Sequence, residues 1–269
     1  MADPFSNMSA AGDDFIAVAV EALERRAAEP VMSAAVDRYL EALPKAQIKR
    51  VVEIGAGSGP VSRRIAAWAP AADVLATEPA AGFLPHARAL AEGIGNLRFE
   101  TRDGTALGLE DASVDLVVLH TVLSHVPDPA PLLDEAFRVL RNGGWLVIFD
   151  GDFSKGSLAS FPGDPLAACQ VYFQQNFVVD PFICGQLAEI ARGAGFETRD
   201  FWMSPRVIRD DDGMIIWVQF TTNMMRDRGQ IGPELAQGLM DEYARRRDAG
   251  TLLGFQAYAT LIAQKHAEG

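Results

Sequence analysis

Cysteine is scarce in this chain. Cys169 and Cys184 are the only two among 269 residues, and they lie too far apart to form a C-x-x-C pair. This pattern argues against a disulfide framework and against a cysteine-ligated zinc site, so we expect no metal. Both cysteines occur in apolar segments with a helix-like pattern, which predicts buried core thiols.

Long apolar runs and excess positive charge are also lacking. No run reaches the roughly 18 apolar residues that suggest a membrane span, and the N-terminal stretch MADPFSNMSAAGDDF has neither region of a signal peptide. Lys and Arg number 24 against 36 Asp and Glu, which gives a formal net charge of −12. Such an acidic chain disfavours non-specific nucleic-acid binding. We therefore expect a cytoplasmic protein without a membrane or nucleic-acid partner.

One dense basic run, Arg245–Arg247, does not change this expectation. Asp241, Glu242 and Asp248 flank it within a helix-like segment. Mixed charges at this spacing predict a solvated helix face.

Glycine, in contrast, is concentrated in one informative segment. Residues 51–60 read VVEIGAGSGP, where a β-branched apolar run ends in Glu53 and passes through glycines at 55, 57 and 59 into a helical pattern. Buried strand, tight turn and helix N-terminus in this order present a nucleotide-like ligand in open α/β sheets. A dinucleotide fingerprint, G-x-G-x-x-G, would need its third glycine at position 60, where this chain has Pro60.

Strand and helix patterns alternate around this segment. Two helices are expected within 13–43, and later helices near 60–69, 80–92 and 129–140. Strands are expected at 48–54, 73–77, 97–101, 114–119 and 145–149. This alternation predicts parallel strands with right-handed crossovers, hence a doubly wound α/β sheet. The remaining expected elements are a loop and helix at 152–180, helices at 181–194, 211–227 and 233–248, and strands at 196–203 and 252–263.

Acidic residues follow three of the expected strands. Glu78 can accept two hydrogen bonds from a ribose diol, and the alternative is an exposed helix cap before Pro79. Asp103 and Gly104 could contact an adenine ring or form an ordinary Asp-Gly turn. Glu53 ends a buried strand, where an unpaired carboxylate is costly, so we favour a role in the site.

The spacing E-x-G-x-G-x-G resembles motif I of the class I S-adenosylmethionine (SAM)-dependent methyltransferases. The segments ATEP, RDGTAL, SVDLVVLHTVLSHVPDP and FRVLRNGGWLVIFDGD resemble later motifs of the small-molecule enzymes, most closely the ubiquinone and menaquinone biosynthesis subgroup. The likeness covers roughly residues 48–152, and the tail GFQAYATLIAQK resembles the family's antiparallel last strand. It implies a seven-stranded, mostly parallel, Rossmann-like sheet with SAM as cofactor. It further implies SAM contacts at Glu53, Gly55, Ala56, Gly57, Glu78, Pro79, Phe83, Asp103, Gly104 and His120, although Phe83 could be simple core.

Methyl transfer from SAM depends mainly on alignment, and a general base is needed only where the acceptor arrives protonated. Candidate bases follow the fourth and fifth strands at His120, His125, Asp150 and Asp152. We favour His125 because an imidazole titrates near neutral pH, and its alternative role is to cap the helix after Pro127. Asp150 and Asp152 could equally orient a substrate hydroxyl or cap a turn.

The second half of the chain is rich in aromatic residues. These residues form either ordinary core or the walls of a pocket for a flat or apolar substrate. They are Phe153, Phe161, Tyr172, Phe173, Phe177, Phe182, Phe201, Trp202, Trp217 and Phe220.

Together these patterns predict an N-terminal helical lid (1–44), a SAM-binding core (45–152) and a C-terminal region (153–269) that begins with a helical cap at about 153–195. The expected function is methyl transfer from SAM to O, N or C of a small aromatic or apolar metabolite. The alternatives are a cyclase or decarboxylase on the same fold and a non-catalytic SAM-binding protein. A homodimer is compatible with each of them.

Overall fold

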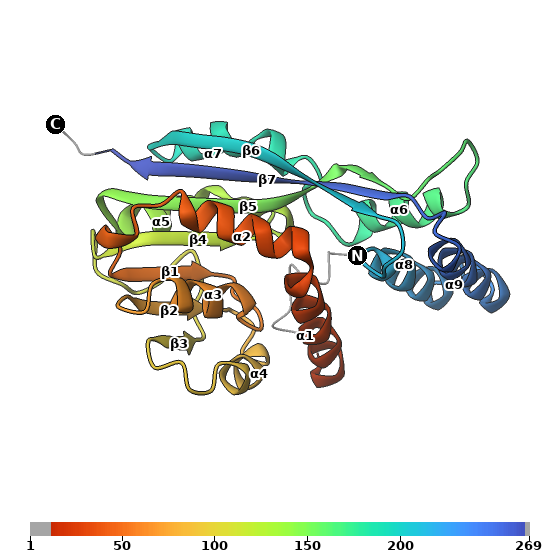
Figure 1. Ribbon diagram of the computed structural model, residues 1–269, viewed down its shortest axis with the longest axis horizontal. Coiled ribbons are helices and arrows are strands. Elements are labelled where there is room, and N and C mark those ends of the chain that lie inside the picture. The colour runs from red at the N-terminus through yellow and green to blue at the C-terminus, as the bar shows by residue number, and fades with distance from the viewer. Residues whose placement is uncertain (1–11, 267–269) are drawn as a thin grey trace.

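One seven-stranded sheet organises the computed structural model, which describes residues 12–266 (Figure 1). Its strand order is β3-β2-β1-β4-β5-β7-β6; β1 to β5 pair in parallel, and β7 runs antiparallel to both of its neighbours. This confirms the doubly wound, mostly parallel sheet with an antiparallel last strand. The strands are β1 (Arg50–Ile54), β2 (Asp73–Thr77), β3 (Leu97–Glu100), β4 (Val114–His120), β5 (Leu140–Ser157), β6 (Phe196–Ile208) and β7 (Gly254–Lys265).

Helices cover both faces of the sheet, because successive apolar residues of the central strands point to opposite sides. On one face, α2 (Pro30–Glu41) and α3 (Pro60–Trp68) pack in one core cluster with Val51 of β1. On the other face, α5 (Ala130–Val139) and α7 (Leu187–Gly193) pack with Val52. A smaller helix, α4 (Phe83–Leu90), packs with β2 and β3 at the edge of the sheet.

Two strands extend further than the sequence predicts. The pattern predicts strands at 145–149 and 196–203, whereas β5 continues to Ser157 and β6 to Ile208. The additional part of β5, GDFSKGS, has low intrinsic strand propensity. Pairing with β7 holds both extensions, since Ser157 pairs with Phe255 and Ile208 with Gly254. Tertiary pairing therefore overrides local preference here.

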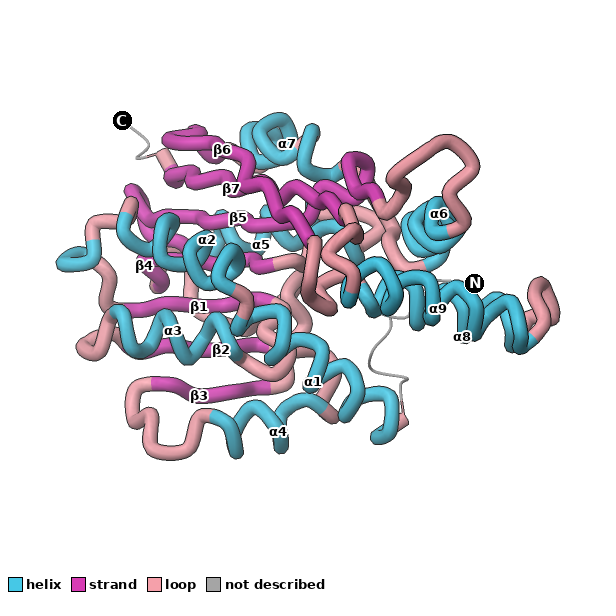
Figure 2. The backbone as a smooth tube through the Cα atoms, turned by 45° about the vertical axis from the view of Figure 1, so that its right-hand side comes forward, coloured by secondary structure: helices cyan, strands magenta, loops and turns pink. Residues whose placement is uncertain are grey.

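Three helices gather at the end of this long ribbon, on the right in Figures 1 and 2. They are α6 (Leu166–Asn176), α8 (Ile215–Asp227) and α9 (Pro233–Asp248), and we call them the cap helices. Their shared core includes Phe173, Trp217 and Tyr243. The segment 153–195 is thus divided, because α6 joins the cap helices whereas α7 packs on the sheet.

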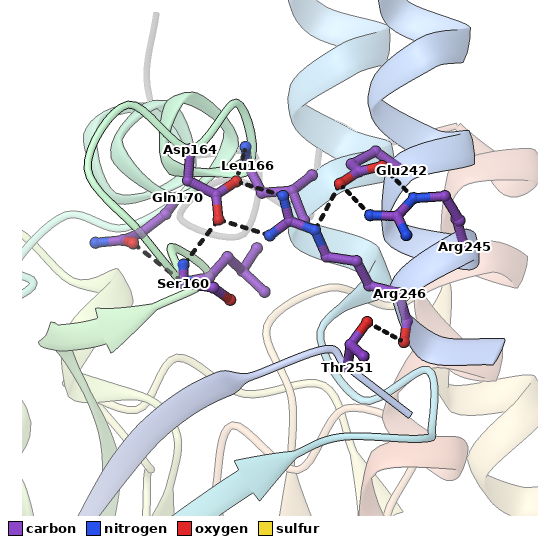
Figure 3. Close-up of polar contacts among 9 residues, drawn as sticks. Ser160, Asp164, Leu166, Gln170, Glu242, Arg245, Arg246 and Thr251 are labelled. Carbon is purple, nitrogen blue, oxygen red and sulfur yellow. Dashed lines mark hydrogen bonds and ion pairs between the residues drawn. The ribbon is translucent and has the colours of Figure 1, made fainter. Parts of the chain in front are cut away.

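A buried ion pair connects α9 to the loop before α6 (Figure 3). Asp164 accepts two hydrogen bonds from the guanidinium of Arg246, at 2.6 and 3.0 Å, and the two side chains are 0% and 4% exposed. Arg246 also pairs with Glu242 on its own helix. The expectation of a solvated face is therefore wrong for Arg246, which points inward, and correct for the exposed Arg245.

Cys169 and Cys184 are buried and free, as the sequence predicts. Within residues 12–266, no helix combines the length and the apolar character needed to cross a membrane. The same part of the chain contains no cluster of three or more His, Cys, Asp or Glu side chains suited to a metal ion.

Candidate active site

A cavity of about 270 Å³ lies where the carboxyl ends of β1 and β4 meet the cap helices. β1 and β4 are adjacent in the sheet, and the strand order reverses between them. Open α/β sheets bind their ligands at such a point, because the loops diverge to opposite faces and leave a crevice.

The glycine turn after β1 lines one end of this cavity. Gly55, Gly57 and Gly59 have φ angles of +74°, +54° and +78°, the left-handed region that favours glycine. A Cβ atom at Gly55 would lie 2.7 Å from Cγ2 of Val122, and one at Gly57 would lie 2.8 Å from Cδ1 of Leu23. Gly55 and Gly57 therefore present backbone rather than side chains to the cavity.

The carboxylate of Glu78 lies beside the glycine turn. Its Oε2 accepts a hydrogen bond from the N–H of Gly57 at 3.0 Å, and its Oε1 accepts one from the N–H of Ala80 at 2.9 Å. Glu78 is only 8% exposed, and burial raises its pKa. It lines the cavity together with Ala56, Pro79 and Phe83, so it is not an exposed helix cap.

Glu53, at the end of β1, also lines the cavity and is 2% exposed. The hydroxyl of Ser62 on α3 donates a hydrogen bond to its carboxyl group. Burial raises the pKa of Glu53 to about 8; the Ser62 hydrogen bond opposes this shift, and the negative charge of Glu78 adds to it. This shift favours the protonated form of Glu53.

Asp103 and Gly104 do not line the cavity. Asp103 is exposed, and its Oδ1 accepts hydrogen bonds from the N–H and the hydroxyl of Thr105, both at 2.8 Å, which lower its pKa. A Cβ atom at Gly104 would lie 2.5 Å from Cγ2 of Ile54, so this glycine permits close packing on β1. The geometry is that of the Asp-Gly turn, and the adenine contact stays a prediction.

The first helix, α1 (Asp13–Ala28), closes one side of the cavity. Its Leu23 contacts the glycine turn as described above. Glu24 accepts hydrogen bonds from the hydroxyl of Ser58, at 2.7 Å, and from Arg63, at 2.5 Å. Ile16 packs in a small apolar cluster with Phe83. Both apolar packing and an ion pair thus hold α1 against the glycine turn.

The three candidate catalytic residues occupy different positions. His120 lines the cavity, but it is 8% exposed, stacks on Phe149 at 4.4 Å, and has its Nδ1 3.3 Å from the hydroxyl of Tyr39. Burial lowers its pKa well below the ordinary value, which makes it a weak base. His125 lines the cavity and is half-buried, with its ring edge-on to Phe153. Asp152 is buried outside the cavity lining, where Lys155 lies 3.6 Å from its Oδ2.

Aromatic side chains form much of the other end of the cavity. Phe153, Phe173, Trp217 and Phe220 line it, and the rings of Phe173 and Trp217 stack at 4.9 Å. Both alternatives therefore hold in part, because these four residues line the cavity while Phe173 and Trp217 are also buried in the core of the cap helices. A flat or apolar substrate stays a prediction. Others in the aromatic set are not part of the cavity; Phe182, for example, is 63% exposed.

Several polar residues of the cavity were not identified by the sequence analysis. Arg26 of α1, Arg206 of β6 and Tyr258 of β7 line it. Arg26 donates a hydrogen bond to the hydroxyl of Thr121 at 2.9 Å, and Thr121 has a φ angle of +57°, a strained conformation for a residue other than glycine. No motif marks these positions. Arg206 also lies beyond the strand predicted at 196–203, so the sequence offered no reason to place it at the site.

Comparison with known proteins identifies the domain around the glycine turn. Residues 52–148 match the family model described as a methyltransferase domain. A demethylmenaquinone methyltransferase from Thermus thermophilus is 32% identical over 159 residues, which are 57% of this chain and 64% of that protein. Residues 52–148 of this chain thus match a methyltransferase domain. This confirms the resemblance and the cofactor class that the sequence predicts.

Similarity beyond the methyltransferase domain is weaker. An uncharacterised 37.1 kDa protein of a Streptomyces fradiae transposon is 28% identical over 229 residues, 84% of this chain and 65% of that protein. The chain thus spans just under two thirds of the length of these two relatives. A crystal structure from Bacillus halodurans, solved as a candidate methyltransferase, has a TM-score of 0.60 at 20% identity and covers 87% of this chain and 100% of its own. At that identity it supports the fold alone.

The glycine end of the cavity in this methyltransferase domain fits SAM. The left-handed glycines present backbone at Gly55 and Gly57, and the buried carboxylate of Glu78 lies beside them, where it accepts hydrogen bonds from two backbone N–H groups. Glu53 adds a second carboxyl group close to the same turn. A nucleoside with a charged amino-acid tail needs these groups: an acceptor for a diol, approachable backbone and an acid.

Proposed function

We propose that this protein is a SAM-dependent methyltransferase whose acceptor is a small molecule with an aromatic or apolar body. One observation carries the proposal. A single cavity is lined at one end by the glycine turn and Glu78, and at the other end by Phe153, Trp217 and Phe220. Donor and acceptor sites that share one enclosed space are what an in-line group transfer requires.

The residues of the glycine end would hold the methyl donor. Glu78 would keep its two backbone hydrogen bonds and accept the hydroxyl groups of a ribose with its remaining lone pairs, and Glu53 would face the amino group of the methionine portion. Bound SAM would supply an activated methyl group, so the protein contributes mainly alignment and exclusion of water. α1 and the cap helices would exclude water from the site, because both line the cavity.

His125 is our candidate for the proton acceptor where the nucleophile of the substrate arrives protonated. It lines the cavity on the short turn after β4, near Phe153. The buried carboxyl group of Asp150 lies close enough to His125 for their charges to interact. The Oδ2 atom of Asp150 also accepts a hydrogen bond from the N–H of Ser124, in the same turn, at 3.2 Å.

Methyl-labelled SAM tests this proposal. The protein is incubated with labelled SAM and a fractionated metabolite extract, and both S-adenosylhomocysteine (SAH) and the labelled product are quantified. We expect stoichiometric SAH and transfer of the label to a low-molecular-weight product, with both lost in Glu78→Ala. SAM consumption without label transfer would instead indicate another reaction on the fold. SAM binding without any turnover would indicate a non-catalytic protein.

A further inference from the structure

Two of the arginines that line the cavity, Arg206 and Arg26, are held by contacts within the protein. Arg206 is 3% exposed, and Arg26 lies on the neighbouring α1. Glu29, which follows α1, is the acidic partner of Arg206. Taking cations out of water is costly unless anions compensate them. The charge of Asp150 also acts on Arg26, and that of Asp211 on Arg206, but the direct ion pair of Arg206 is with Glu29.

The contacts of Arg206 leave part of its guanidinium unused. Its Nη2 donates to Glu29 and, at 2.7 Å, to the carbonyl of Gly213, while its Nη1 lies 3.4 Å from the hydroxyl of Tyr258. Its Nε is buried and has no hydrogen-bond partner. An unpaired buried donor is unfavourable, so this nitrogen fits a ligand that supplies an acceptor.

Arg26 is less well neutralised. Its hydrogen bond at 2.9 Å goes to the neutral hydroxyl of Thr121. Burial and the charge of Arg206 both lower the pKa of Arg26. Burial also acts to lower the pKa of Arg206, but the charges of Tyr258 and Glu29 raise it overall. The protein therefore compensates the charge of Arg26 less well than that of Arg206.

The position of Arg206 in the sheet assigns it to the acceptor rather than to the methyl donor. Glu53 and Glu78 follow β1 and β2, whereas Arg206 and Tyr258 belong to β6 and β7 at the other end of the strand order. Arg26 contacts Thr121, just after the central β4, and therefore lies between the two halves. The aromatic walls belong to the same half as Arg206, since α8, which carries Trp217, follows β6.

From this geometry we infer that the acceptor is a carboxylate with a flat apolar body, whose anionic group is bound by Arg206 and Arg26. This inference rests on the proposed function and adds the substrate class. A planar carboxylate matches the donor fork of a guanidinium, and the carboxylate of Glu29 already occupies one side of Arg206. The substrate's ring packs against Phe153, Phe173 and Trp217.

The test measures binding to the protein–SAH complex by calorimetry. Salicylate, coumarate and indoleacetate serve as probes, each paired with its primary amide, which has nearly the same shape and no charge. The dissociation constant of SAH is measured first; failure of SAH to bind would refute the proposed function separately from this inference. We expect at least one carboxylate to bind about tenfold or more tightly than its amide.

Variants then locate the preference. Arg206→Gln should abolish the preference for the carboxylate and leave the SAH dissociation constant unchanged, whereas Arg206→Lys should retain part of it. Glu29→Gln should strengthen carboxylate binding, because a competing anion is removed. Arg209→Gln, at an exposed arginine that bonds the carbonyl of Gly250, is the matched control and should have no effect.

Several outcomes would overturn the inference. It is wrong if no carboxylate binds more tightly than its amide, or if Arg206→Gln retains the preference. If Arg26→Gln weakens SAH binding and leaves the carboxylate preference intact, Arg26 contacts the methyl donor and the paired site is wrong. Melting temperatures identify variants that fail to fold; for these, the comparison with Arg206→Lys decides.

Discussion

Glu53 should make the stability of the ligand-free protein fall as the pH rises. Its pKa is raised from 4.5 to about 8 in the folded protein. Between these values the folded state keeps a proton that the unfolded state has lost. The stabilisation is therefore complete below the pKa of the unfolded state, and it is lost as the pH rises through the folded-state pKa of about 8. At about 1.36 kcal/mol per pKa unit, a shift of this size corresponds to roughly 5 kcal/mol as an upper estimate.

Glu53→Gln isolates this contribution, because an amide resembles the protonated acid, can accept the Ser62 hydrogen bond and cannot ionise. Urea unfolding is measured from about pH 5 to about pH 9. The variant and the natural protein should be similarly stable at the acidic end, and the variant should be several kcal/mol more stable at the basic end.

Glu135→Gln is the matched control of opposite sign. Glu135 is buried too, at 8% exposed, but its hydrogen bonds with Arg138 lower its pKa. The contribution of Glu135 to stability is present above the pKa of the unfolded state and is lost as the pH falls through the pKa of the folded state. Glu135→Gln should therefore destabilise the protein at neutral and basic pH, with the difference closing only in acid. A constant difference between Glu53→Gln and the natural protein at every pH would refute the assigned protonation state.

Three further predictions concern the donor site, the cap helices and α1. Glu78→Ala should weaken SAM binding about tenfold to a hundredfold in calorimetry, because charged hydrogen bonds to the ribose are lost. Unchanged affinity would disprove the ribose contact. The exposed Glu92→Ala is the control. Arg246→Met should cost about 3–5 kcal/mol in urea unfolding, since Asp164 stays buried without its partner; Arg245→Met on the same helix should leave stability unchanged, and equal effects would contradict the assignment. Deleting residues 1–28 should lower methyl transfer at least about tenfold, because α1 closes the cavity; unchanged turnover would show that α1 is no lid.

The sheet and the donor site were largely predictable because their signals are local. β1, the glycine turn and α3 follow one another without interruption, so apolar pattern and turn chemistry fix each element. Glu78 could be placed beside the turn because the carboxyl ends of adjacent parallel strands meet at one edge of the sheet. Asp103 follows the same rule, yet its side chain bonds to Thr105, because a short Asp-Gly turn satisfies the carboxylate locally.

The extended strands and the inward arginine were not predictable for a different reason. The end of β5 has the composition of a loop, and only its partner strand β7 makes it a strand. Arg246 lies between Arg245, which is exposed, and Arg247, which is partly exposed. Its buried partner, Asp164, lies 82 residues earlier, and no local pattern links the two positions. Both features depend on contacts between segments that are distant in the chain.

The same distinction separates the two ends of the cavity. Residues at the donor end come from consecutive strand–turn units, which is why a family motif can describe them. Residues at the acceptor end come from α1, β6, β7 and α8, and the ion pair between Arg206 and Glu29 joins positions 177 residues apart. Because that pair connects the end of α1 to the far strand of the sheet, an acceptor that competes with Glu29 for Arg206 would also change how α1 is held over the cavity. Recognition of the acceptor and closure of the site would then depend on the same two side chains.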